Sequence, residues 1–127
     1  MKRLSTILAA ALLLGTAAPA LPQNGLRQVP LGFCALTNMA GPAPLSVCNS
    51  GAGVPAGTTY AVICAYVQGI NYRDDGGLPT GVLGTGGQGI VPISSSVPTC
   101  IPYDGNFSAL LFIQQAPGAI LGVTFYK

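Results

Sequence analysis

The 127-residue sequence has no histidine, no tryptophan and no glutamate, and only 6% of its residues are charged. Charged residues normally make up about a quarter of a soluble domain. Histidine and glutamate are common general bases and metal ligands, so their absence removes much catalytic and metal chemistry. We therefore expect a non-enzymatic protein with no catalytic residues, no metal and no cofactor. Half of the residues are hydrophobic, which argues against a disordered chain.

The first 20 residues have the three-part pattern of a secretory signal peptide. Lys2 and Arg3 precede an uncharged apolar run from 4 to 18, and Ala18 and Ala20 are the small residues before a cleavage point. The alternative is a membrane anchor, but the run is shorter than the roughly 20 residues of a span. We predict a signal peptide over residues 1–20, a domain over 21–127, and no membrane span after cleavage.

Cleavage would leave a domain with balanced charge. It would keep three cations and three anions, namely Arg27, Arg73, Lys127, Asp74, Asp75 and Asp104. A neutral domain without a basic patch has no electrostatic means of binding nucleic acid. We therefore expect no nucleic-acid partner.

Four cysteines lie in the predicted mature domain: Cys34, Cys48, Cys64 and Cys100. An even number in a short exported chain is typical of a disulfide framework, whereas zinc sites need closer pairs. Four cysteines allow three pairings, and we favour Cys34–Cys48 as a local link with Cys64–Cys100 joining two strands. This framework predicts a secreted, periplasmic or cell-surface protein of bacterial type.

The remaining pattern predicts strands separated by glycine- and proline-rich turns. Prolines at 92, 98 and 102 place any strand within 90–103 at a sheet edge. We expect loops at 40–57 and 76–89, and strands at 31–37, 58–67, 70–73, 107–114 and 120–126. The predicted fold is therefore a small, all-β, single-domain β-sandwich, jelly-roll-like and stabilised by disulfides.

Five segments in this order resemble small, mostly uncharacterised proteins of tailed phages and prophages. They are VPAGTTYAVI (54–63), YRDDG (72–76), PT (79–80), YDGNFSAL (103–110) and GAILGVTFYK (118–127). The resemblance implies a compact β-sandwich with a structural or decorating role. Those proteins generally lack a signal peptide and cysteines, so an exported bacterial relative fits this chain better.

The charged segment Arg73–Asp74–Asp75 admits two interpretations. It is either a polar turn with a local Arg–Asp pair or, with Asp104 nearby, a weak cation site or a carboxylate pair. The turn is the simpler interpretation, because two adjacent aspartates supply few oxygen ligands. Tyrosines in the strands could stack on sugars, but ordinary packing is the interpretation we favour for them.

The last two predicted strands are apolar on both faces. We expect Leu111, Ile113, Ile120 and Tyr126 to form an outward face on adjacent strands, which packs on a second copy or another surface protein. The alternative is that a second layer buries both faces. The function we predict is structural or adhesive, through protein–protein contacts or homo-oligomer formation. The alternatives are a virion decoration protein and a secreted carbohydrate- or ligand-binding module.

Overall fold

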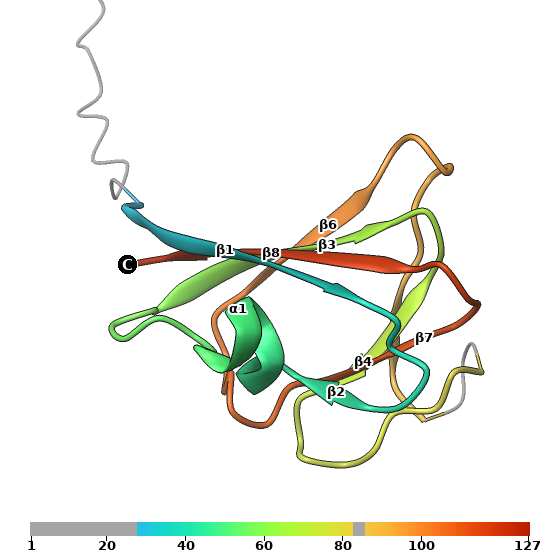
Figure 1. Ribbon diagram of the computed structural model, residues 1–127, viewed down its shortest axis with the longest axis horizontal. Helices are drawn as coiled ribbons and strands as arrows, with labels where there is room; N and C mark the ends of the chain where they lie inside the picture. Colours follow the sequence, from blue (N-terminus) through green and yellow to red (C-terminus); the bar gives the residue numbers. More distant parts are fainter. Residues whose placement is uncertain (1–27, 83–85) are drawn as a thin grey trace, which may run out of the picture.

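The computed structural model describes residues 28–82 and 86–127, which form two packed β-sheets (Figure 1). The predicted signal peptide, residues 1–20, lies outside the described residues. Each sheet has four antiparallel strands. Sheet A has the order β1 (Pro30–Thr37), β8 (Ile120–Tyr126), β3 (Tyr60–Tyr66) and β6 (Thr99–Tyr103). Sheet B has the order β2 (Ala43–Pro44), β7 (Leu111–Gln114), β4 (Ile70–Arg73) and β5 (Gln88–Ile90).

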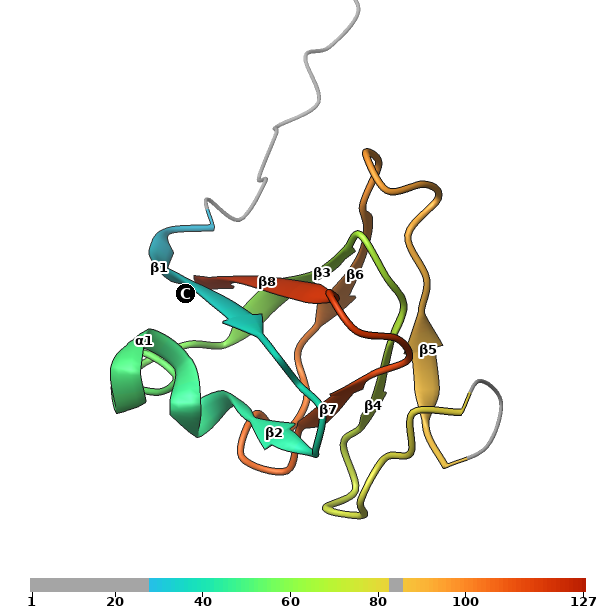
Figure 2. The ribbon, with the colours of Figure 1, turned by 45° about the vertical axis from the view of Figure 1, so that its right-hand side comes forward.

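The strand order is that of a jelly roll. First and last strands pair, as do β2 with β7, β3 with β6, and β4 with β5. The chain thus winds as one long antiparallel ribbon, whose halves fold over each other into two layers (Figure 2). The prediction of a small all-β sandwich is confirmed.

Alternation along the strands places the core between the two sheets. In β8, Leu121, Val123 and Phe125 are fully buried, and their partners in β3 are Ala65, Ile63 and Ala61. From sheet B, Ile70 and Phe112 meet them from the opposite side. Successive side chains of a strand point to opposite faces, so one face of each strand makes this core.

The predicted elements agree with the structure in the strands and differ in the loops. The predicted strands 70–73 and 120–126 have the observed bounds of β4 and β8. The predicted strand 107–114 begins only at Leu111, because the Asn106 side chain accepts a hydrogen bond from the Ser108 amide and holds a turn there. Glycine and proline had suggested an unstructured loop at 40–57, which instead contains β2.

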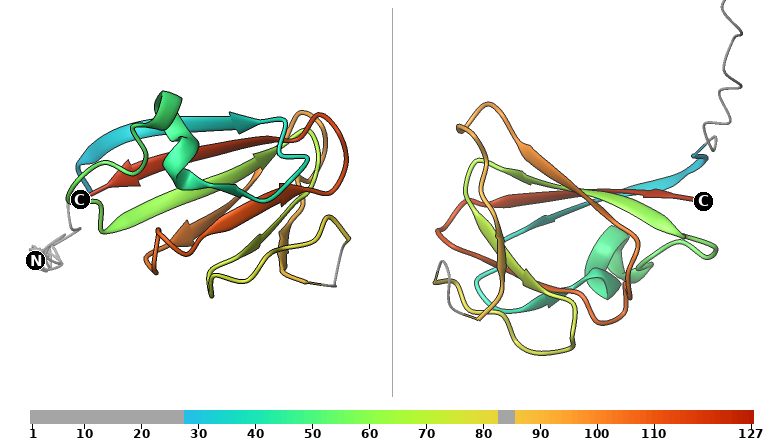
Figure 3. Two further views of the ribbon diagram at one scale, coloured as in Figure 1. Left: turned by 60° about the horizontal axis from the view of Figure 1, so that its bottom comes forward. Right: turned by 180° about the vertical axis from the view of Figure 1, so that it is seen from behind.

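Two short helical turns follow β2 in that same segment. They are η1 (Leu45–Val47) and α1 (Cys48–Gly51), and α1 packs against β1 at one end of the sandwich (Figure 3). Among the described residues, no helix has the length and hydropathy needed to cross a bilayer.

Both disulfides have the favoured pairing. Cys34 of β1 is bonded to Cys48 of α1, which ties this helical turn to sheet A. Cys64 of β3 is bonded to Cys100 of β6, and the two residues are direct partners in the strand register. Two disulfides in a small domain are typical of an oxidising compartment.

Part of the outer face of sheet B is covered by the segment that follows β4. Asn71 of β4 points away from the core, yet it is fully buried. Its side-chain nitrogen donates to the carbonyl oxygens of Thr80 (2.7 Å) and Val82 (3.0 Å). These carbonyls belong to the glycine-rich connection between β4 and β5, so Asn71 fastens this loop over the sheet.

Gln115 completes the Asn71 network from the other end of sheet B. Its side-chain nitrogen donates to Asn71 Oδ1 at 2.7 Å. A Cβ atom on Gly69 would lie 2.1 Å from Gln115 Oε1, so a glycine is needed to leave room for this amide. The buried Asn71 amide thus has hydrogen-bond partners on both its nitrogen and its oxygen, as buried polar groups generally require.

We predict that Asn71→Ala lowers the free energy of unfolding by about 1–3 kcal/mol, because the three hydrogen bonds of this buried side chain are lost. Urea denaturation measures this value. The exposed residue Gln68 provides a control, since Gln68→Ala should change stability by less than about 0.5 kcal/mol. An Asn71→Ala variant as stable as the control would contradict the role of the network.

Asn71→Asp gives a pH test of the same network. The introduced carboxylate would face two carbonyl oxygens in a buried site, so its pKa should rise above the unfolded value. A raised pKa means that the folded state is favoured at low pH and loses stability as the pH rises. The Asp variant should therefore regain stability relative to wild type between neutral pH and about pH 4. A constant difference over that range would argue against burial of the group.

Candidate interaction face

The outer face of sheet A is free of charge. No strand of this sheet contains a lysine, arginine, aspartate or glutamate. By alternation and register, its outward residues form a surface that we call the aromatic face. They are Phe33, Ala35, Thr37, Tyr60, Val62, Cys64, Tyr66, Cys100, Pro102, Ile120, Gly122, Thr124 and Tyr126. A solvated sheet face normally alternates buried apolar with outward polar residues, so this surface is unusual.

Two rings lie beside a glycine at the centre of the aromatic face. Gly122 of β8 is buried although it points outward. A Cβ at this position would lie 2.9 Å from Tyr66 Cε2 and 3.5 Å from Phe33 Cε2. Rings from the two flanking strands therefore approach the backbone of the central strand, and an alanine here would require Tyr66 to move.

The ring edges and one aliphatic side chain remain open to solvent. Phe33 is 57% exposed, Ile120 37% and Tyr66 36%. At the other end of the face, the rings of Tyr60 and Tyr126 are 5.8 Å apart and partly buried. The result is a sheet surface of apolar and aromatic groups whose only polar side chains are hydroxyls.

The predicted interaction face is divided between the two sheets. Ile120 and Tyr126 lie on the aromatic face, whereas Leu111 and Ile113 are half-buried on the outer face of sheet B. The expectation of adjacent strands is wrong, because residues 115–119 carry the chain from one sheet to the other instead of forming a hairpin. These four residues therefore do not form one surface.

Sequence reasoning missed the strongest members of the aromatic face. Phe33 lies next to Cys34 in β1, and the alternation of a buried cysteine with an outward ring was the available signal. The face of β3 that carries Tyr60 and Tyr66 was visible as an alternating pattern. The pattern does not show that β8 lies between β1 and β3 in the sheet.

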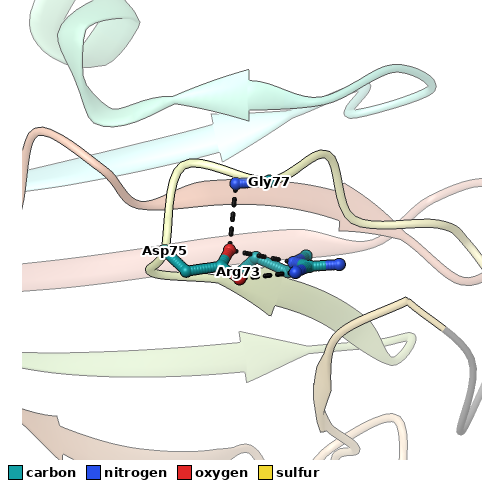
Figure 4. A network of polar contacts seen from close by, with 3 residues as sticks. All are labelled: Arg73, Asp75 and Gly77. Atoms are coloured by element: carbon teal, nitrogen blue, oxygen red, sulfur yellow. Dashed lines mark hydrogen bonds and ion pairs between the residues drawn. The ribbon is translucent and has the colours of Figure 1, made fainter.

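The acidic segment forms the predicted polar turn (Figure 4). Arg73 Nε donates to Asp75 Oδ1 at 2.9 Å, and a second contact joins Arg73 Nη2 to Asp75 Oδ2. The Gly77 amide donates to Asp75 Oδ1 at 2.9 Å. The guanidinium, with the Gly77 amide, holds the pKa of Asp75 well below its usual range. The Asp75 carboxylate therefore accepts its hydrogen bonds from groups of this same turn.

The surroundings of this turn bear on the alternative of a cation site. Within residues 28–82 and 86–127, no three His, Cys, Asp or Glu side chains gather as metal ligands would. A hollow of about 330 Å³ beside the turn is lined by Tyr72, Gln88 and the Arg73–Asp75 pair, among others. Its polar groups bond each other, since Tyr72 donates to Gln88 Oε1 at 2.6 Å. In addition, burial raises the pKa of Tyr72, so its hydroxyl stays protonated and can donate this hydrogen bond.

The chain matches no protein-family model, and neither a curated protein nor a solved structure is significantly similar to it. The resemblance to phage proteins therefore stays a prediction. A fold of this kind does not by itself define a function, so the surface has to carry the argument.

We predict that Arg73→Met raises the pKa of Asp75 toward its usual range, because the guanidinium is the main cause of the lowered value. The carboxyl carbon shift of Asp75 in an NMR titration measures this change. A lowered folded-state pKa stabilises the fold above the unfolded pKa, and this contribution is lost as the pH falls. It is small here, because the pair is exposed to solvent and salt.

Lys127→Met removes a cation elsewhere and is the matched control, which should leave the Asp75 titration unchanged. An unaltered Asp75 titration in Arg73→Met would show that the ion pair does not persist in solution.

Proposed function

We propose that this chain is an exported, non-enzymatic β-sandwich protein that acts through protein–protein contacts of the aromatic face, first of all with a second copy. The observation that carries the proposal is the complete absence of charged side chains from all four strands of sheet A. Large apolar patches on the surface of a domain mark interaction sites.

The charge balance favours contact between identical copies. The predicted mature domain has equal numbers of cations and anions, and none of them lies in the strands of sheet A. Two copies that approach through this face therefore meet little electrostatic repulsion. Each square ångström of apolar area removed from water contributes about 25 cal/mol, and a stable interface covers roughly 800 Å² per partner.

We expect the exposed rings to contribute most of the binding free energy of this face. Aromatic side chains are enriched among the residues that dominate binding energies, particularly near the middle of an interface. Phe33 and Tyr66 hold such a position over Gly122. Because both rings lie against the backbone of Gly122, their ordering on binding costs less conformational entropy than that of free side chains.

Export is supported by the cysteine chemistry and by the pattern of the first 20 residues. Both disulfides close within one chain, which suits an oxidising compartment. A secreted, periplasmic or cell-surface location follows from this proposal, and a surface or assembly role fits it.

We predict that wild-type protein starting at residue 21 self-associates, and that Phe33→Ser combined with Ile120→Ser weakens association by about tenfold or more. Both side chains are exposed, so the variant should keep the circular dichroism of the wild type. Sedimentation velocity over a concentration series measures the monomer fraction. Leu78→Ser is the matched control, because Leu78 is 69% exposed but lies outside the aromatic face.

A wild-type protein that remains monomeric at the highest concentrations would exclude self-association. An equal loss of association in Leu78→Ser would show that the contact lies elsewhere.

A further inference from the structure

The two disulfides lie in opposite environments. Cys34 and Cys48 are 1% and 0% exposed and belong to the core between the sheets. Cys64 is half-buried and Cys100 is exposed, and both belong to the aromatic face. Access of a reagent to sulfur is one of the factors that set the rate of thiol–disulfide exchange. The two bonds therefore differ in the accessibility that the reaction requires.

The position of β6 makes the outer bond still more accessible. β6 is an edge strand that pairs with β3 alone in sheet A. Pro102 lies two residues beyond Cys100 in this strand and has no backbone N–H, which leaves the free edge without a regular hydrogen-bonding row. Nothing in sheet A lies beyond Cys100 on its edge side.

The electrostatic setting permits approach of an anion. The attacking species in exchange is a thiolate, and no strand of sheet A carries a carboxylate that would repel it. Asp104 follows the end of β6, outside the strand. The polar side chains of the aromatic face are uncharged hydroxyls.

We infer that the Cys64–Cys100 disulfide is a site of thiol–disulfide exchange with external thiols, whereas Cys34–Cys48 is structural. The thiolate attacks Sγ of the exposed Cys100, a new S–S bond forms there, and Cys64 leaves as a thiolate that takes up a proton. When the reagent is a dithiol, its second thiolate attacks the reagent sulfur that is bonded to Cys100 in the mixed disulfide. Cys100 is released reduced, and the dithiol becomes a cyclic disulfide after loss of two electrons.

The inner bond keeps the domain folded during this reaction. A reagent reaches Cys34 and Cys48 only when the core opens, so their reduction reports opening of the domain. The pair thus serves as an internal control within the same molecule. The inference does not depend on the proposed partner, since it concerns a free copy of the domain.

The test is reduction under native conditions at a concentration where the protein is monomeric. The protein is exposed to dithiothreitol, sampled over time, alkylated and mapped by mass spectrometry. Cys64 and Cys100 should be labelled about tenfold or more faster than Cys34 and Cys48. Equal rates for the two pairs, or labelling of Cys34 and Cys48 first, would overturn the inference, as would the absence of labelling before unfolding.

A monothiol identifies the sulfur that is attacked. Glutathione in excess should leave its adduct on Cys100, with Cys64 as the free thiol that is alkylated. An adduct mainly on Cys64 would contradict the assigned direction of attack.

The double variant Cys64→Ser and Cys100→Ser controls for folding. It should keep the circular dichroism of the wild type, and its remaining disulfide should resist dithiothreitol as it does in the wild type. Rapid reduction of Cys34–Cys48 in this variant would show that the outer bond protects the inner one, and the two-site assignment would be wrong.

Discussion

The insertion of β8 between β1 and β3 is the interaction on which the rest of the structure depends. Its inward side chains, Leu121, Val123 and Phe125, are fully buried and form the middle of the core. On its other side, Gly122 is small enough for a ring from each of the two neighbouring strands to lie against it. One strand thus provides both the packing that stabilises the domain and the surface that we propose it uses.

The outer faces of the two sheets differ in how far their apolar side chains are covered. Part of the outer face of sheet B is covered by residues 80–82, and the buried Asn71 amide holds this cover by donating to two backbone carbonyl oxygens. On the aromatic face of sheet A, by contrast, Phe33, Tyr66 and Ile120 are exposed within the part of the chain that the structure describes. The buried Asn71 amide thus closes part of the first face, and the second is the face that we propose for binding.

The cysteines follow the same division between inside and outside. Cys34–Cys48 joins β1 to the helical turn that would otherwise have little core of its own. Cys64–Cys100 joins two strands that are already paired by their backbones, so it adds less to the definition of the fold. Its place on the aromatic face connects the chemistry of this bond with the surface proposed for binding, since a partner that covers the face would also shield the sulfur atoms.

Alternation and turn residues are local properties that need no tertiary information, and they were enough to predict the all-β class and most of the longer strands. The bounds of β4 and β8 followed directly from such patterns. Local patterns do not say which strands become neighbours. The separation of Leu111 from Ile120, and the approach of Phe33 and Tyr66 to Gly122, therefore depend on how the chain winds into two sheets. The burial of Asn71 was decided in the same way, because its hydrogen-bond partners come from a loop and a strand end that only the folded structure brings to it.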